Sequence, residues 1–275
     1  DLLDWSAKTF PDFFRALHYT LIERSAKLQQ ALEERLKGRI AEGKAAICCD
    51  LDAPEVAENA IVFANEFFDA LPVDVVSHDG QVLVDVREDR FVEVLVAPSA
   101  SVLEYLDRYS VHPEAGERVE AGLTGPEWVA RLAGLVKRGF FLVVDYGYTR
   151  DELLAGRHRG TVMAYREHTA SPDPYEAPGE QDITAYVNFT ALSAAGEQAG
   201  LARLGLVTQS QFLTGIGEAN EFADAFEGCN LPQEHAKRAL QLKHLVTPAG
   251  MGETFQVLLM GKGVGGDGIS GLKFR

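Results

Sequence analysis

The chain has 275 residues, 46% of them hydrophobic, which is enough for a sizeable buried core in one large domain or two small ones. Its 26 basic and 41 acidic residues give a formal net charge of -15, and this balance argues against a nucleic-acid partner, which needs clustered positive charge. Three cysteines do not make a disulfide framework, and no apolar run approaches the roughly 20 residues of a membrane span.

Strand and helix signals alternate in the first quarter of the chain. Residues 18–23 are rich in β-branched and aromatic side chains and predict a strand. Leucines recur at helical spacing within residues 26–38, and Gly38 is the predicted end of that helix. Residues 45–51 and 60–65 are apolar runs, typical of strands that helices cover on both faces.

The middle of the chain changes pattern. Residues 73–96 alternate apolar and polar side chains around an Asp-Gly pair at 79–80, so they predict an antiparallel hairpin inserted into the α/β pattern. Residues 117–138 are compatible with helix, and residues 139–148 form the most strand-like run of the chain. Residues 150–188 are rich in Gly, Pro, His and charge, which indicates a long functional loop on the substrate side.

The remaining residues return to alternating helix and strand. The alternation predicts an α/β fold with a doubly wound, mainly parallel sheet, in a single domain over residues 1–263. The predicted C-terminal elements are a helix, a strand, two helical stretches, a last strand and a flexible tail, at residues 188–200, 201–209, 218–226, 232–246, 253–263 and 264–275.

Polar side chains follow four predicted strands in succession. In a doubly wound sheet, ligands bind outside the carboxyl ends of the strands. Carboxylates there can accept hydrogen bonds from ribose hydroxyls and from an exocyclic amine, so the pattern predicts a nucleoside ligand. The side chains at these four ends are Glu23, Asp50 and Asp52, then Asn65, Glu66 and Asp69, and finally Asp145 and Tyr146.

Glu23 fits the acid that binds ribose at the end of the second strand in such folds. That acid lies about 20 residues beyond a glycine-rich turn, yet residues 1–22 contain no glycine. We therefore expect the first strand and its turn to lie upstream of residue 1. An equally open alternative is that Glu23 only caps the start of the helix at Ser25.

Five segments carry a family resemblance. They read FANEFFDALPV, VVDYGY, GTVMAYREH, PGEQDITAYVNFTAL and TQSQFL. From Asp1 to about Gly261 the chain resembles the MidA family of class I, Rossmann-like methyltransferases of bacteria and mitochondria. Its mitochondrial member is similar to a protein-arginine methyltransferase needed for complex I assembly. The family carries a glycine-rich turn just before DLL, and here DLLDW opens the chain.

The resemblance implies a seven-stranded sheet and S-adenosyl-L-methionine as cofactor. It implies a protein substrate with an accessible arginine, with a subunit of NADH dehydrogenase (complex I) as one candidate, and it leaves a homodimer open. We expect a bacterial cytoplasmic protein, with the mitochondrial matrix as the alternative compartment, and no nucleic-acid or membrane partner. The seven histidines show no metal-ligand spacing, so no metal is expected.

Carboxylates are the groups that an arginine acceptor requires. A guanidinium stays protonated near neutral pH, and carboxylates hold its planar fork. Glu66 and Asp69 are three residues apart and fall on roughly one face if the chain turns helically after Asn65. We predict these three residues as catalytic. The alternative for Asp69 is a carboxylate that stabilises a helix N-terminus.

Further site residues are predicted on both ligand sides. Cofactor contacts are predicted for Glu23, Asp50, Leu51 and Asn65, with Asp52 as an alternative to Asp50. Substrate contacts are predicted for Asp145, Tyr146, His168, Glu180 and Asp182. For the last three, a structural loop that is held by its own polar groups is the alternative.

Two other function classes stay open from the sequence. One is a non-catalytic assembly or binding protein on a methyltransferase fold, and the other is a nicotinamide-dependent oxidoreductase, which the lack of a dinucleotide fingerprint weakens. Around the predicted acceptor loop, Phe63 and Ala64 are expected in the core, and Phe67, Phe68 and Leu71 are expected to pack the loop down.

Overall fold

The structure is a computed structural model that describes residues 2–52, 55–166 and 169–274. The chain divides into two compact units, Asp1–Val56 and Ala57–Arg275. The single domain expected over residues 1–263 stays a prediction.

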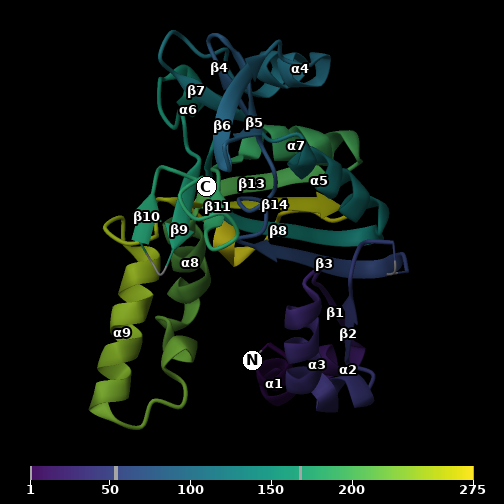
Figure 1. Ribbon diagram of the computed structural model, residues 1–275. Coiled ribbons are helices and arrows are strands. Elements are labelled where there is room, and N and C mark those ends of the chain that lie inside the picture. Colours follow the sequence, from purple (N-terminus) through teal and green to yellow (C-terminus); the bar gives the residue numbers. More distant parts are fainter. Residues whose placement is uncertain (1, 53–54, 167–168, 275) are drawn as a thin grey trace. The chain divides into compact units, whose positions relative to one another are not determined.

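The first unit is a small α/β arrangement (Figure 1). Its two strands pair in parallel, with Tyr19 opposite Ala45, so their carboxyl ends lie at the same edge. The long helix runs through Gly38, the residue predicted to end it, and the chain turns instead at Gly43 with a φ of 69°. The elements are α1 (Leu2–Thr9), α2 (Pro11–Ala16), β1 (Tyr19–Ile22), α3 (Ala26–Ala41) and β2 (Ala45–Cys48).

The second unit is built around a mixed sheet in the order β3-β8-β14-β13 (Figure 1). The first two strands are parallel, and β14 is antiparallel to both of its neighbours. The α/β class and the strands expected at residues 60–65, 139–148, 201–209 and 253–263 are confirmed, whereas the count of seven strands stays a prediction. The strands are β3 (Ala57–Asn65), β8 (Val136–Tyr148), β12 (Val187–Asn188), β13 (Ala202–Thr208) and β14 (Phe255–Lys262), with β12 parallel to the end of β8.

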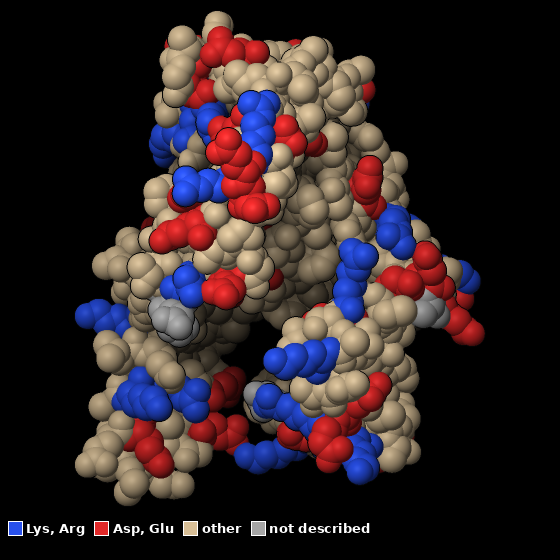
Figure 2. Space-filling view, viewed as in Figure 1, with Lys and Arg blue, Asp and Glu red and all other residues tan. Residues whose placement is uncertain are grey.

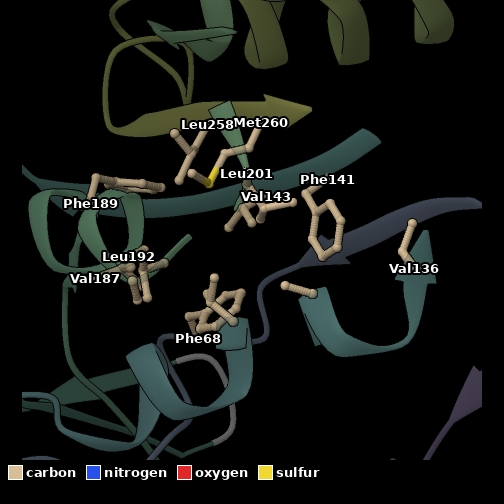
Figure 3. Close-up of a cluster of buried hydrophobic side chains, with 13 residues drawn as sticks. Phe68, Val136, Phe141, Val143, Val187, Phe189, Leu192, Leu201, Leu258 and Met260 are labelled. Atoms are coloured by element: carbon tan, nitrogen blue, oxygen red, sulfur yellow. The ribbon is translucent and has the colours of Figure 1, made fainter. Parts of the chain in front are cut away.

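Alternate residues of β8 point into two hydrophobic layers. Phe141 and Val143 pack with side chains of α5 and α7 on one face of the sheet (Figure 3). Phe140 and Leu142 lie in the other layer, beneath α8 and η3. Helices therefore cover both faces, as the continuous apolar runs predict. The covering elements are α5 (Thr124–Gly134), α7 (Phe189–Gln198), α8 (Gln209–Gly217) and η3 (Ser270–Leu272).

Two predictions about packing are wrong. Phe63 was expected in the core, but it is 60% exposed, because Val62 and Ala64 occupy the face of β3 that packs against the core. Residues 264–275 were expected to form a flexible tail, but Leu272 is 4% exposed and packs in the same layer as Val207.

A second sheet interrupts the α/β pattern after β3. The turn predicted at Asp79-Gly80 joins two antiparallel strands, 74–77 and 80–87, and a second turn at residues 88–89 adds the strand 90–96, so residues 73–96 form three strands and not a single hairpin. They belong to an antiparallel sheet in the order β6-β5-β4-β7, on which α4 (Ala100–Tyr109) packs. Residues 118–121 were predicted as helix but form the edge strand β7, because pairing with β4 buries Val119 and Ala121. The strands are β4 (Asp74–Ser77), β5 (Gly80–Arg87), β6 (Arg90–Val96) and β7 (Arg118–Ala121).

The segment predicted as a long loop also has regular structure. Within residues 150–188, three short strands form an antiparallel sheet in the order β10-β9-β11. The elements are α6 (Arg150–Leu154), β9 (Met163–Arg166), β10 (Thr169–Ser171) and β11 (Asp182–Thr184).

The insertion between β13 and β14 is helical. It contains α8, the short helices η1 (Glu218–Asn220) and η2 (Ala223–Phe226), and α9 (Pro232–Val246). The helical stretches expected at residues 218–226 and 232–246 are confirmed. None of the helices in the described part of the chain is long and apolar enough to span a membrane.

Candidate functional site

The loop that follows β3 has a strained start. Glu66 has a φ of 47°, in the left-handed region that a residue with a side chain seldom adopts. Its N–H is still bound to the carbonyl of Val144 at 3.0 Å, so the turn begins where pairing with β8 ends. Residues 66–73 form bends and turns, so the alternative of a helix N-terminus at Asp69 does not apply. Strain of this kind persists only when the surroundings enforce it.

Asp145 lies directly beneath this loop. Its Oδ2 accepts hydrogen bonds from the main-chain N–H groups of Phe67, Phe68 and Asp69 at 3.2, 3.0 and 3.4 Å. Its Oδ1 accepts from the N–H of Tyr146 at 3.0 Å. The residue was predicted as a substrate contact, but its side chain is 0% exposed and is directed at the main chain of the loop.

Asp69 is the buried carboxylate of the loop itself, with 5% exposure. Its Oδ2 accepts a hydrogen bond from the Tyr146 hydroxyl, and its carbonyl accepts from the N–H of Ala185 at 3.0 Å. Its Oδ1 is buried and makes no hydrogen bond of good geometry among the described residues, although the N–H of Ala70 lies close enough to lower the pKa of the carboxyl. Buried polar atoms are almost always paired, so this oxygen has the capacity to accept from a ligand.

The two buried acids hold protons more tightly than usual. Burial raises the pKa of Asp145 to about 7, and the neighbouring Asp69 charge adds to the shift. Burial also raises the pKa of Asp69, with smaller contributions from the charges of Glu66 and Asp182. Two acids so close resist ionising together, which makes one of them available as a proton acceptor near neutral pH.

Glu66 is the exposed carboxylate of the group. The side-chain amide of Asn65 donates to its Oε1 at 3.1 Å, which holds one oxygen in place. Asn65 and Glu66 are thus hydrogen-bonded to each other, and the charge of Glu66 acts on Asp69, although the chain after Asn65 bends instead of turning helically. The catalytic roles of the three residues stay a prediction. Asp182, at the start of β11, is close enough for its charge to act on Asp69.

Aromatic rings border the two acids. The Tyr146 ring lies 5.3 Å from that of Tyr186 in an edge-to-face arrangement, and Tyr186 lies 5.7 Å from His158. Sequence reasoning assigned no role to Tyr186 or His158, although Tyr186 stands in the segment TAYVNF. Aromatic faces attract cations, so these rings add to a surface suited to a positively charged acceptor.

A third buried acid, Glu120 on β7, also escaped the sequence analysis. It is 3% exposed and accepts from the N–H and the hydroxyl of Thr161 at 2.8 and 3.1 Å. The Thr161 hydroxyl in turn accepts from the N–H of Tyr186 at 3.0 Å. Burial raises the pKa of Glu120. This network fixes the GT pair at 160–161 and the main chain at Tyr186.

The predicted cofactor residues of the first unit follow its two strands. Glu23 accepts from the N–H of Ser25 at 2.7 Å, which is the helix-start contact of the alternative interpretation. Asp50 accepts from the N–H of Asp52 at 3.0 Å, and Leu51 is 3% exposed. The parallel register places both acids at one edge, and such acceptors fit the hydroxyl and amine donors of a nucleoside.

The other predicted substrate residues are less central. Glu180 pairs with Arg166 at 2.6 Å, and both side chains are more than half exposed. His168 lies outside the described residues. Within residues 2–52, 55–166 and 169–274, no group of three or more His, Cys, Asp or Glu side chains could hold a metal ion.

Comparisons with known proteins agree with this architecture. A family model described as "Putative S-adenosyl-L-methionine-dependent methyltransferase" matches residues 1–207. The zebrafish (Danio rerio) protein arginine methyltransferase NDUFAF7, mitochondrial, is 33% identical over 209 residues, which are 72% of this chain and 46% of that protein. The Drosophila melanogaster homologue is 32% identical over 220 residues, 74% of this chain and 48% of that protein. The chain thus spans about half the length of these curated relatives.

Two solved structures from Burkholderia thailandensis share the fold. An uncharacterised superfamily protein matches with a TM-score of 0.80 and 26% identity, over 94% of this chain and 69% of the other. A superfamily member bound to S-adenosyl-homocysteine matches with a TM-score of 0.75 and 25% identity, over 93% and 67%. Because the family model covers most of the sequence, the chain belongs to this family of S-adenosyl-L-methionine-dependent methyltransferases.

Proposed function

We propose that the protein transfers a methyl group from S-adenosyl-L-methionine to an arginine of a protein substrate. The observation that carries the proposal is the pair of carboxylates after β3: exposed Glu66, and buried Asp69 with an unpartnered Oδ1. The names of the curated relatives, and the S-adenosyl-homocysteine in a structural neighbour, support it.

Each residue of the pair has a distinct task. Glu66 accepts from one edge of the guanidinium, with its orientation set by Asn65. Asp69 accepts through Oδ1, and together the two charges concentrate the positive charge and leave one nitrogen able to attack. Once the nitrogen–carbon bond forms, that nitrogen releases a proton, and Asp69, whose pKa is raised by burial, receives it. S-adenosyl-L-methionine, when bound, supplies the methyl group on a positively charged sulfur.

The other predicted residues complete the proposal. Cofactor contacts are assigned to Glu23, Asp50 and Asn65, whose side chains carry acceptors and follow strands, and to Leu51, which adjoins Asp50. On the acceptor side, Tyr146 lines the site and holds Asp69, and Asp182 adds negative charge. Glu180 is assigned to substrate binding, and His168, which lies outside the described residues, stays a predicted substrate contact.

The proposed partner is a protein with an accessible arginine, and a subunit of NADH dehydrogenase is the first candidate. No nucleic-acid or membrane partner is proposed, and basic and acidic side chains are interspersed on the face drawn in Figure 2. A homodimer is an open alternative to a monomer. We propose a bacterial cytoplasmic location, with the mitochondrial matrix, where the names of the relatives point, as the alternative.

The test uses the full-length protein. Mass spectrometry of arginine methylation on NADH-dehydrogenase subunits, with and without the intact gene, should show a mark that depends on the gene. Calorimetry should show binding of S-adenosyl-L-methionine. Absence of both would favour a non-catalytic assembly protein. A fluorescence titration that detects tight NADH binding would instead favour the oxidoreductase.

A further inference from the structure

One oxygen of Asp145 gathers three consecutive main-chain N–H groups, those of residues 67–69. Phe67 and Phe68 lie between the two carboxylates assigned to the acceptor, Glu66 and Asp69, and the third N–H belongs to Asp69 itself. The contact joins β8 to the loop after β3 across 78 positions of the sequence. The acid is fully buried, and its hydrogen bonds to the main-chain N–H groups of residues 67–69 and of Tyr146 occupy both carboxylate oxygens.

We propose that Asp145 is a positioning residue: its carboxylate holds the main chain at 67–69 so that Glu66 and Asp69 face the acceptor together. The proposal rests on the function proposed above. It assigns to Asp145 no contact with the substrate, in contrast to the expectation from the sequence.

The hydrogen-bond pattern requires a carboxylate at this position. Oδ2 accepts from the loop and Oδ1 accepts from the N–H of Tyr146, so both sides of the group must be acceptors. In Asp145→Asn the shape is kept, but the amide can present an oxygen to only one side. Its NH₂ group then faces an N–H group on the other side, and charge-assisted bonds become neutral ones.

The strained conformation of Glu66 is consistent with this role. A left-handed residue with a side chain is held only by its surroundings, and the anchored N–H groups begin at the next residue. The titratable groups facing Asp145 are Asp69 and Tyr146, which are hydrogen-bonded to each other. A change at Asp145 therefore also alters Asp69 and Tyr146, which are both assigned to the acceptor side.

Amide hydrogen exchange tests the anchoring without any assay of activity. In the full-length protein, Asp145→Asn should speed exchange at residues 67–69 about tenfold, the effect of losing a hydrogen bond of roughly 1.4 kcal/mol. Glu120→Gln is the matched control, because it neutralises another buried carboxylate that binds main-chain N–H. It should speed exchange at Thr161 and leave residues 67–69 unchanged. Equal acceleration of residues 67–69 in both variants would overturn the proposal.

Kinetics then test the consequence for the acceptor. With an arginine peptide as substrate, Asp145→Asn should lower kcat/KM at least tenfold, while the Kd for S-adenosyl-L-methionine stays within about twofold. Faster exchange with unchanged kcat and KM would show that Asp145 holds the loop but does not position Glu66 and Asp69 for the reaction. If the unsubstituted protein does not methylate arginine, the proposed function fails, and the exchange data still decide whether Asp145 anchors the loop.

A measurement on the unsubstituted protein covers the case in which Asp145→Asn does not fold. With ¹⁵N-labelled phenylalanine, the amide proton shifts of Phe67 and Phe68 should move together with pH, because both protons bind the same oxygen. The two signals should share one midpoint. Two different midpoints would contradict a common carboxylate anchor.

Discussion

In the second unit, buried carboxylates bind the main chain of two segments, and the two segments differ in whether a buried oxygen lacks a hydrogen-bond partner. Glu120 binds the main-chain N–H of Thr161, and Asp145 binds the main-chain N–H groups of residues 67–69. Around Glu120, both carboxylate oxygens have partners within the protein. Beside Asp145, the Oδ1 of Asp69 has none. A buried acid whose oxygens are all hydrogen-bonded thus has a structural role, whereas a buried acceptor without a partner can bind a ligand.

The largest effect on activity is expected in the loop that contains Glu66 and Asp69. Glu66→Gln should reduce methyl transfer to an arginine peptide by about 10²–10³-fold, the usual result of removing one preorganised charged group. Steady-state kinetics with the full-length protein measure it. Retention of more than half of the activity would show that Glu66 is not catalytic.

The second prediction concerns pH. The pKa of Asp145 in the fold, about 7, lies above its ordinary value of 3.8, so the fold binds this proton more tightly than the unfolded chain does. The stability contribution is therefore complete below about pH 4 and is lost as the pH rises to about 7. Chemical denaturation should show a loss of up to about 4 kcal/mol that Asp145→Asn removes. A wild-type curve that runs parallel to that of the variant would contradict the shift.

The third prediction concerns the closed network. Glu120→Gln leaves the N–H or the hydroxyl of Thr161 without its acceptor and should lower the free energy of unfolding by about 1–3 kcal/mol. The measurement is urea denaturation at pH 8. If Glu120→Gln lowers the free energy of unfolding no more than a surface substitution does, the hydrogen bonds of Glu120 do not stabilise their segment as those of Asp145 stabilise the loop after β3.

The smallest effect is expected at the surface. Glu180 and Arg166 form an exposed ion pair, so Glu180→Gln should change the free energy of unfolding by less than about 1 kcal/mol. If Glu180 contributes to substrate binding, KM for a basic peptide should rise by less than about fivefold, and the rise should disappear at high salt. A lower kcat would instead show that Glu180 takes part in the reaction and is more than an exposed surface contact.

Much of the fold could be predicted because long apolar runs leave few alternatives. The run at residues 139–148 packs on both faces and forms most of β8. The strands β7, β9 and β11 could not be found in this way, because they are three or four residues long and exist through pairing with distant segments. Their own sequences carry too little periodicity to reveal it.

The same distinction between local sequence and pairing with distant segments applies to the site. The spacing of Glu66 and Asp69 predicts one face only for a helical turn, and the structure has bends and turns there instead. The position of Asp145 beneath them depends on the pairing of β3 with β8, and the burial of Glu120 depends on the pairing of β7 with β4. Neither can be read from local sequence, and an acid near a strand end is as compatible with an anchor as with a ligand contact.

The long separation between anchor and loop has a consequence for the order of assembly. Residues 66–69 leave the ribosome well before Asp145, which follows Phe67 by 78 residues. Until β8 is synthesised and docks beside β3, the loop lacks the carboxylate that binds its amides, and such distant contacts form late in folding. The loop after β3 therefore acquires its shape only when the centre of the sheet is complete.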